Sequence, residues 1–242
     1  MIKKKRTWKN IFEKFNNKKK INNYNLKNLL ILAGHLKSKT GSFGLNKWKK
    51  EISNIKKKIN KPNGSILEIG CGSGAVLKSF EKDMKIYGVD YSESMIEISK
   101  KALPNGKFIC CEANQISFRE NKFDAVIIFS SIQYFPNTKY FKDVLNKIQK
   151  ILKKNSYLYI GEIIEKNKQA QFNNYRKNQL SKKEYKKMYQ GKQNSNLKHF
   201  SLNRLEVINF LERGFKNVEI TNSILRGKEK EVYRFDLCCQ KK

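Results

Sequence analysis

The sequence predicts an α/β fold, and three observations predict it. Strand-like and helix-like segments alternate from residue 65 onward. The first strand runs directly into three glycines at alternate positions, Gly70, Gly72 and Gly74. An acidic residue, Asp90, ends the next strand about 20 residues later. Such alternation implies a doubly wound sheet that is mostly parallel, with right-handed crossovers and helices on both faces.

The strands and helices can be assigned in chain order from hydrophobic pattern and turn residues. Short apolar, β-branched runs predict strands near residues 66–70, 85–89, 107–111, 123–129 and 156–162. Helices are expected between them, near residues 74–82, 92–102 and 138–152. Ser201 is a candidate N-cap for a helix over residues 202–213, which Gly214 ends. Two last strands are expected near residues 215–222 and 231–239.

The first 60 residues are predicted to form a helical cap. Large apolar residues recur every three or four positions within residues 1–22, which predicts an amphipathic helix. A second helix, a loop and a third helix are expected over residues 26–36, 38–44 and 45–59. We therefore divide the chain into this cap, residues 1–60, and a main domain, residues 61–242. The cap is interpreted as a lid over a ligand, a basic arm for nucleic acid, or a packing extension of the core.

Residues 165–200 lose this periodicity and are rich in Lys, Asn, Gln and Tyr. They stand before the last helix of the main domain. Ligands of open α/β sheets bind outside the carboxyl ends of the strands. We expect residues 165–200 to be an insertion that covers the substrate at this edge.

The formal net charge of +31 is distributed unevenly. Residues 1–64 hold 19 Lys and Arg against 2 Asp and Glu, whereas residues 65–164 hold 14 against 11. A basic excess suits nucleic acid, anionic lipid or a phosphorylated substrate. The lysines are scattered and arginines are few, so compositional drift explains the charge equally well.

The cysteines and the lengths of the apolar runs indicate in which cellular compartment the protein works. Two adjacent pairs suit neither a zinc site nor a disulfide framework, so we expect no metal site and five buried thiols in a reducing compartment: Cys71, Cys110, Cys111, Cys238 and Cys239. No apolar run reaches transmembrane length, and no apolar region of a signal peptide follows the basic start. We expect a cytoplasmic protein without a membrane span and leave its oligomeric state open.

The stretch Ile66-Leu-Glu-Ile-Gly-Cys-Gly-Ser-Gly resembles the first motif of class I S-adenosylmethionine-dependent methyltransferases. It places Glu68 within the strand and Cys71 between two glycines. The resemblance implies a Rossmann-like, seven-stranded sheet, S-adenosylmethionine as cofactor and S-adenosylhomocysteine as product. The glycine spacing departs from the Gly-x-Gly-x-x-Gly of dinucleotide sites, so a nicotinamide-dependent dehydrogenase is the least favoured alternative.

The next two strand ends match the same family. A carboxylate at the position of Asp90 can accept hydrogen bonds from both ribose hydroxyls of an adenosine. The family pattern of an acid, a small polar residue and a methionine is matched here, and Tyr91 completes the segment: Asp90, Ser92 and Met95. After the third strand, the resemblance implies that Glu112 takes the adenine amino group and that Ala113 takes a ring nitrogen through its backbone. Asn114 follows them and is assigned to the same site.

The fourth strand begins Phe123-Asp124 and ends Phe129-Ser130-Ser131, like the fourth motif of the family, so Phe129 and Ser130 are also assigned to the cofactor. The following Ile132-Gln-Tyr-Phe-Pro-Asn137 resembles a frequent Leu-His-His-Leu-Pro-Asp. Gln133 and Tyr134 replace the histidines, which puts a histidine base at this position in doubt.

Methyl transfer needs an acceptor atom held in line behind the methyl group, and a base only where the acceptor loses a proton. Four residues are candidates for that base or for orienting the acceptor: His35, His199, Tyr134 and Glu162. Of these, Tyr134 and His199 are the predicted catalytic residues. His35 also adjoins a loop that could bind an anionic group through Lys37, Lys39 and Thr40.

We therefore predict an S-adenosylmethionine-dependent methyltransferase that acts on a small-molecule acceptor. O-methylation is slightly favoured, and an anionic metabolite is one candidate. An RNA-modifying methyltransferase is an alternative that the basic flanks favour, but no recognisable RNA module or base-binding Pro-Pro-Tyr motif is present, which makes nucleic acid the less favoured partner. A partner protein that binds S-adenosylmethionine without catalysis is the second alternative.

Overall fold

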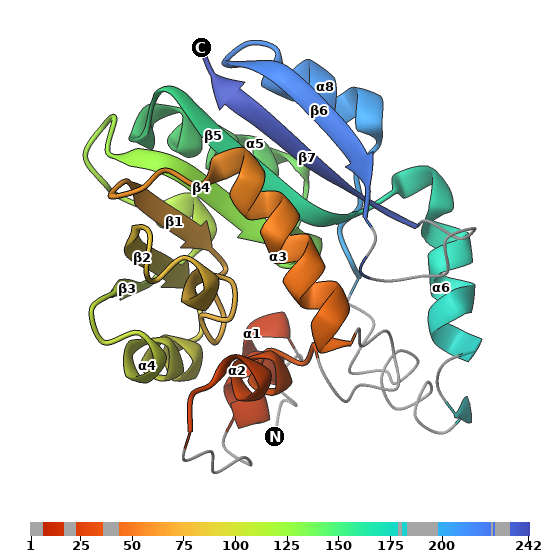
Figure 1. Ribbon diagram of the computed structural model, residues 1–242. Helices are drawn as coiled ribbons and strands as arrows, with labels where there is room; N and C mark the ends of the chain where they lie inside the picture. Colours follow the sequence, from red (N-terminus) through yellow and green to blue (C-terminus); the bar gives the residue numbers. More distant parts are fainter. Residues whose placement is uncertain are drawn as a thin grey trace, which may run out of the picture.

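The computed structural model describes residues 7–16, 23–35, 44–178, 181–182, 198–223, 225 and 233–242. Its centre is a seven-stranded sheet in the order β3-β2-β1-β4-β5-β7-β6 (Figure 1). The strands are β1 (Ser65–Ile69), β2 (Lys85–Asp90), β3 (Lys107–Cys110), β4 (Phe123–Phe129), β5 (Leu152–Ile164), β6 (Phe215–Asn222) and β7 (Arg234–Lys241). β1 to β5 are parallel, and β7 runs antiparallel to β5 and β6. The doubly wound, mostly parallel sheet of seven strands is confirmed.

Helices cover both faces of this sheet (Figure 1). One core contains apolar side chains of α2 (Leu26–Leu32), α3 (Leu45–Ile59) and α4 (Glu93–Ala102). The other contains side chains of α5 (Thr138–Ile151) and α8 (Arg204–Leu211). Alternate strand residues enter the two cores, because successive side chains of a strand point to opposite faces: Ile66 and Ile127 on one face, Leu67 and Val126 on the other.

The predicted helix over residues 74–82 is wrong. Those residues form tight turns with one short 3₁₀ helix, Leu77–Ser79. Ala75, Val76, Leu77 and Phe80 are all buried. An α-helix advances 100° per residue, so it could not turn these four positions toward one narrow face of the core. Tight turns bury all of them and return the chain to β2 within a short segment.

The last helix begins two residues later than predicted. Leu202 is buried and pairs with Glu165 in an isolated bridge, so it is not available to start a helix. Asn203 caps α8 instead of Ser201, and Glu206 completes a capping box with it. Within the insertion, α6 (Gln169–Asn178) is described. Most of the rest of the insertion and of the predicted loop at residues 38–44 lies outside the described residues.

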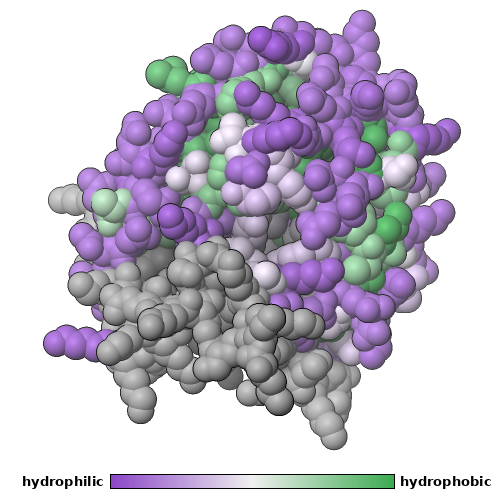
Figure 2. Space-filling view, turned by 180° about the vertical axis from the view of Figure 1, so that it is seen from behind, coloured by the Kyte–Doolittle hydropathy of each residue, from purple (hydrophilic) through white to green (hydrophobic). Residues whose placement is uncertain are grey.

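The thiols are less uniformly buried than predicted. Cys71, Cys238 and Cys239 are buried, whereas Cys110 is exposed and Cys111 is intermediate. The reason is topological, because Cys110 ends β3, the edge strand of the sheet. No helix among the described residues is long and apolar enough to cross a membrane. From behind, hydrophilic residues cover most of the described surface, with hydrophobic residues in smaller patches (Figure 2).

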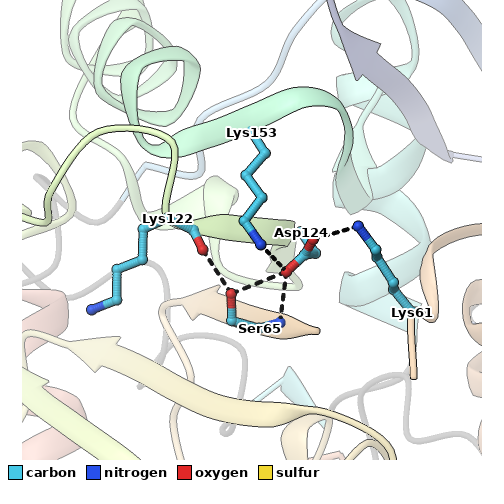
Figure 3. Close-up of polar contacts among 5 residues, drawn as sticks. All are labelled: Lys61, Ser65, Lys122, Asp124 and Lys153. Atoms are coloured by element: carbon cyan, nitrogen blue, oxygen red, sulfur yellow. Dashed lines mark hydrogen bonds and ion pairs between the residues drawn. The ribbon is translucent and has the colours of Figure 1, made fainter. Parts of the chain in front are cut away.

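Asp124 ties three segments together at the amino edge of the sheet (Figure 3). Its side chain is 1% exposed and accepts hydrogen bonds from Lys61 at 2.8 Å and Lys153 at 2.7 Å. The backbone N–H of Ser65 also donates to it, at 2.9 Å. Burial alone would raise the pKa of this carboxyl, but the hydrogen bonds from Lys153, Lys61 and Ser65 outweigh burial and lower the pKa to about 2.

We predict that Asp124→Asn lowers the free energy of unfolding by about 2 kcal/mol at neutral pH. The folded-state pKa lies below the unfolded-state value, so this stabilisation is present above about pH 5 and is lost as the pH falls toward 2. Chemical denaturation at pH 7 and at pH 3 measures both effects.

Asp143→Asn is the matched control, because Asp143 pairs with Lys139 on the surface of α5 and is 41% exposed. It should cost less than about 0.5 kcal/mol. If the free energy of unfolding fell equally in the two variants, the buried position of Asp124 would add nothing to stability.

Candidate functional site

A cavity of about 320 Å³ lies at the carboxyl ends of the parallel strands. Four strand ends contribute to its lining: Gly70 to Gly72 after β1, Asp90 and Tyr91 after β2, Cys111 to Ala113 after β3, and Phe129 to Ser131 after β4. Parallel strands deliver their carboxyl ends to the same edge of the sheet, so residues distant in sequence meet there.

The glycine turn leaves its backbone open to the cavity. Gly70 and Gly72 have φ angles of 75° and 52°, which L side chains rarely adopt. A Cβ on Gly72 would meet no atom within 4 Å, so only its missing side chain keeps this space clear. Gly74 serves packing instead, because a Cβ there would lie 3.2 Å from Ser99 of α4. A ligand can therefore approach the backbone closely at Gly72.

Asp90 is held in place by the turn that it faces. Its carboxylate accepts hydrogen bonds from the backbone N–H of Gly72 and of Ser92, both at 2.9 Å. Ser92 is the N-cap of α4, and its side chain accepts from the Met95 backbone N–H. Burial raises the pKa of Asp90 to about 6, although these N–H donors oppose the rise. The carboxylate is thus oriented before any ligand binds.

Glu68 lies one strand away and is 2% exposed. Its Oε2 atom has no hydrogen-bond partner among the described residues. Burial raises the pKa of this carboxyl well above its usual range, and the nearby Asp90 raises it further. Buried carboxylates are normally paired, so an unpaired one that lines a cavity indicates a missing cationic partner.

Glu112 and Tyr140 form the far wall of the cavity. The Tyr140 hydroxyl donates to Glu112 at 3.0 Å, and the Asn114 backbone N–H points to the same hydroxyl at 3.4 Å. Tyr140 stands in the first turn of α5, where Asn137 caps the helix by accepting from its backbone N–H at 2.9 Å. Glu112 therefore enters the cavity already oriented by a helix N-terminus.

Aromatic residues from three separate segments close the cavity. Trp8 and Phe12 come from α1 (Trp8–Asn16), which packs across the strand ends. The Trp8 ring lies 4.9 Å from Tyr134 and 4.9 Å from His199, centroid to centroid. Phe12 lies 5.1 Å from Tyr134. The N-terminal helix and the end of the insertion thus meet over the site.

The predicted site residues are largely brought together. The predicted catalytic and cofactor residues all line the cavity except Gly74 and Asn114. The further candidate Glu162 is buried and is not among the lining residues. His35 also lines the cavity, with its ring stacked on Trp48, while Lys37, Lys39 and Thr40 lie outside the described residues. Tyr140 and Arg234 are among the lining residues that sequence reasoning did not assign to the site. No local sequence motif marks either residue, because each is brought to the cavity only by the packing of distant segments.

Comparison with known proteins agrees with this geometry. Residues 67–160 match the family described as "Methyltransferase domain". A demethylmenaquinone methyltransferase of Thermotoga maritima is 30% identical over 52% of this chain and 55% of its own length, so the chain spans about half of that relative. An uncharacterized protein of Methanocaldococcus jannaschii is 31% identical over 76% of this chain and 78% of its own length.

A crystal structure from Thermotoga maritima has a similar fold. It is a SAM-dependent methyltransferase described as a possible histamine N-methyltransferase. It matches with a TM-score of 0.61 and 19% identity over 96% of this chain and 98% of its own. At this identity the likeness shows the fold alone. The family match, the methyltransferase relative and this fold together show a class I S-adenosylmethionine-dependent methyltransferase.

The residues of this methyltransferase fit the methyl donor. The donor's methionine part carries an ammonium group, and Glu68 offers a buried carboxylate oxygen that no described residue hydrogen-bonds. Its ribose carries two hydroxyls, and Asp90 offers a carboxylate held by two backbone donors. The open turn at Gly72 lets the backbone approach the ligand. The donor set is therefore that of a site for S-adenosylmethionine.

We predict that Glu68→Gln stabilises the free methyltransferase but weakens its binding of S-adenosylhomocysteine. The pKa of Glu68 is higher in the folded protein than in the unfolded chain. As the pH rises above 4.5, ionisation of this group therefore stabilises the unfolded chain more than the folded protein. Glutamine removes that effect and should raise the melting temperature at pH 7.5. It also removes the partner of the ammonium group, so affinity should fall by about tenfold to a hundredfold.

5′-Methylthioadenosine is the control ligand, because it keeps the adenosine but lacks the amino acid. Its affinity, measured by calorimetry, should not change in Glu68→Gln. A variant that melts lower and binds both ligands more weakly would contradict the assignment and give Glu68 a structural role.

Proposed function

We propose that this protein transfers the methyl group of S-adenosylmethionine to a small-molecule acceptor. The observation that carries the proposal is the buried Glu68 Oε2 atom, for which the described part of the chain supplies no hydrogen-bond partner. It lies in the same cavity as Asp90 and the open Gly72 turn. The name of the Thermotoga maritima relative, a demethylmenaquinone methyltransferase, supports a small acceptor. Fold likeness alone would not carry this conclusion.

The cofactor would lie along the strand ends in chain order. Glu68 would pair with the ammonium group, Asp90 would accept from the ribose hydroxyls, and Glu112 would accept from the adenine amino group. Met95 and Phe129 line the cavity and are 2% and 4% exposed, which supports apolar contacts with the adenosine part. Gly70, Cys71, Tyr91, Ala113 and Ser130 would supply the remaining contacts of this half.

When bound, the donor supplies a sulfonium-activated methyl group. The protein's own task is to hold the acceptor in line and to keep water away. Trp8, Phe12 and Tyr134 close the cavity and would exclude water from it. Tyr134 would orient the acceptor through its hydroxyl.

His199 is the proposed base, since it lines the cavity next to Tyr134. A hydroxyl acceptor must lose a proton as it gains the methyl group, whereas a neutral amine can attack with its lone pair first. A base at this position therefore supports O-methylation. The RNA-modifying alternative gains nothing from the cavity, because aromatic side chains cover it from two sides.

The first test is titration of the protein with S-adenosylhomocysteine. We predict binding in a one-to-one ratio, and a loss of about 1–3 kcal/mol for Asp90→Ala through the missing charge-assisted hydrogen bonds. The carboxylate form of Asp90 is needed, and its pKa is about 6. Affinity should therefore be about tenfold lower at pH 5 than at pH 7.5.

Asp90→Asn separates the titration of Asp90 from other effects of pH, and its affinity should change less over the same interval. A protein that binds neither S-adenosylhomocysteine nor S-adenosylmethionine would overturn the proposal.

The second test addresses the catalytic assignment. We predict that His199→Gln and Tyr134→Phe lower kcat for a hydroxyl acceptor by about tenfold to a thousandfold, with unchanged affinity for S-adenosylhomocysteine. An acceptor panel of phenols, carboxylates and amines, followed by mass spectrometry, identifies a usable substrate. If His199→Gln methylates the phenols as fast as the unaltered enzyme does, His199 is not the base.

A further inference from the structure

Gln133 is a buried amide in the wall of the cavity. It is 2% exposed and lines the cavity from the short 3₁₀ helix Ile132–Tyr134, directly after β4. Its Oε1 atom has no hydrogen-bond partner among the described residues. Buried amide oxygens normally accept a hydrogen bond, because an unsatisfied one lowers the stability of the folded protein. An unsatisfied amide oxygen on a residue that lines a cavity therefore indicates that a ligand supplies the donor.

Two contacts fix the orientation of this amide. Its Nε2 donates to the backbone carbonyl of Ser130 at 2.7 Å and to the Ser130 hydroxyl at 3.4 Å. A carbonyl can only accept, so the nitrogen end of the amide must face Ser130 and the oxygen end must face away. Ser130 has a φ angle of 52°, which residues with side chains rarely adopt, and its N–H donates to the Gly161 carbonyl of β5 at 3.1 Å. The Ser130 backbone therefore holds Oε1 in place before a ligand binds.

Gln133 lies in the part of the cavity that the proposed function gives to the acceptor. The carboxylates proposed to hold the methyl donor lie in or after the first three strands: Glu68, Asp90 and Glu112. Gln133 instead follows β4, and its backbone carbonyl accepts from the Phe200 N–H at 2.9 Å, at the end of the insertion. This part of the cavity, the acceptor half, also contains three aromatic side chains: Trp8, Tyr134 and His199.

The polar groups of the cavity lining disfavour an anion beside Gln133. An amide oxygen carries a partial negative charge and no proton, so it binds N–H and O–H groups and repels carboxylates and phosphates. Arg234 also lines the cavity, but it forms a buried ion pair with Glu162 at 3.6 Å. Its charge is therefore already balanced within the protein. A hydrogen-bond donor is thus the chemical group that fits Gln133.

We propose that Gln133 is a specificity-determining residue that accepts a hydrogen bond from an N–H or O–H group of the methyl acceptor. The assignment rests on the proposed function and deepens it, because it names the chemical group, a hydroxyl or an amine, by which the acceptor is recognised. A hydroxyl has one proton, so an acceptor hydroxyl that loses its proton to His199 needs a second donor group for Gln133. A primary amine has two N–H groups and can bind Gln133 with one of them.

The test titrates the protein, saturated with S-adenosylhomocysteine, with phenol, aniline and fluorobenzene. These probes share the ring and are nearly equal in size, but only phenol and aniline carry a hydrogen-bond donor. We expect phenol and aniline to bind at least about fivefold more tightly than fluorobenzene. Fluorobenzene is the most apolar probe and gains most from leaving water, so burial alone would give the opposite order. Ligand-observed NMR measures the three affinities.

Variants then assign the preference to its residue. Gln133→Met keeps the length of the side chain but removes the amide, so the preference for phenol over fluorobenzene should fall below about twofold, with unchanged affinity for S-adenosylhomocysteine. Gln133→Glu keeps an acceptor oxygen and should keep the preference, which covers the case in which Gln133→Met fails to fold. Gln115→Met is the matched control, because Gln115 is exposed and is not among the lining residues, and it should keep the preference.

Three results would overturn the inference: no preference for phenol over fluorobenzene in the unaltered protein, a preference that survives in Gln133→Met, or a preference that is lost in Gln133→Glu. Weaker binding of S-adenosylhomocysteine by Gln133→Met would also overturn it and assign the residue to the cofactor. In each case the unaltered protein still binds S-adenosylhomocysteine and the proposed function stands. Failure of the proposed function is distinct, because then the unaltered protein does not bind S-adenosylhomocysteine.

Discussion

Two buried carboxylates at neighbouring strand ends are the constraint around which this methyltransferase is arranged. Glu68 and Asp90 lie on β1 and β2, and Asp90 raises the pKa of Glu68 in addition to the effect of burial. Placing two acids together away from solvent costs stability unless a cation joins them. The methyl donor brings an ammonium group and a sulfonium. Under the proposed function, the free protein would bear this energetic cost and recover it on binding the cationic donor.

In the rest of the fold, the residues that stabilise the sheet and the residues that form the cavity lie at opposite ends of the strands. Asp124 joins β4 to Lys61, Ser65 and Lys153 at the amino edge of the sheet. The cavity lies at the opposite, carboxyl edge, where glycines with positive φ and the strained Glu162 are found. Ion pairs and hydrogen bonds thus stabilise the amino edge of the sheet. The carboxyl edge can therefore keep strained or exposed backbone and polar groups that a ligand can reach.

The two flanking segments make the strand ends into an enclosed site. α1 is tied to the N-terminus of α4, where Glu13 accepts from the Glu93 backbone N–H at 3.0 Å. At its other end, the Trp8 indole donates to the Lys198 carbonyl at 3.4 Å, beside His199. The acceptor half therefore exists only when the N-terminal helix and the insertion meet. Under the proposed function, an enclosed site of this kind would suit a small acceptor better than a polymer.

The sequence by itself determined the order of strands and helices, and it predicted most of the residues that follow or end the strands around the cavity. Strand ends such as Asp90 and Glu112 are marked locally, by an apolar run followed by an acid, and a parallel sheet brings all such ends to one edge. It missed the turns at residues 74–82, because burial of four clustered apolar residues overrode helical pattern. It also placed the start of α8 too early, since Leu202 pairs with Glu165.

Only the tertiary structure decided which residues of distant segments complete the cavity lining. Arg234 is one of many basic residues in the chain, and nothing near it in sequence sets it apart. It is selected by its partner Glu162, 72 residues away, and by Phe172 from the insertion. Tyr140 likewise gains its role from contact with Glu112 across the sheet edge. Local patterns carry local geometry, whereas a site assembled from distant segments depends on long-range packing that no short motif encodes.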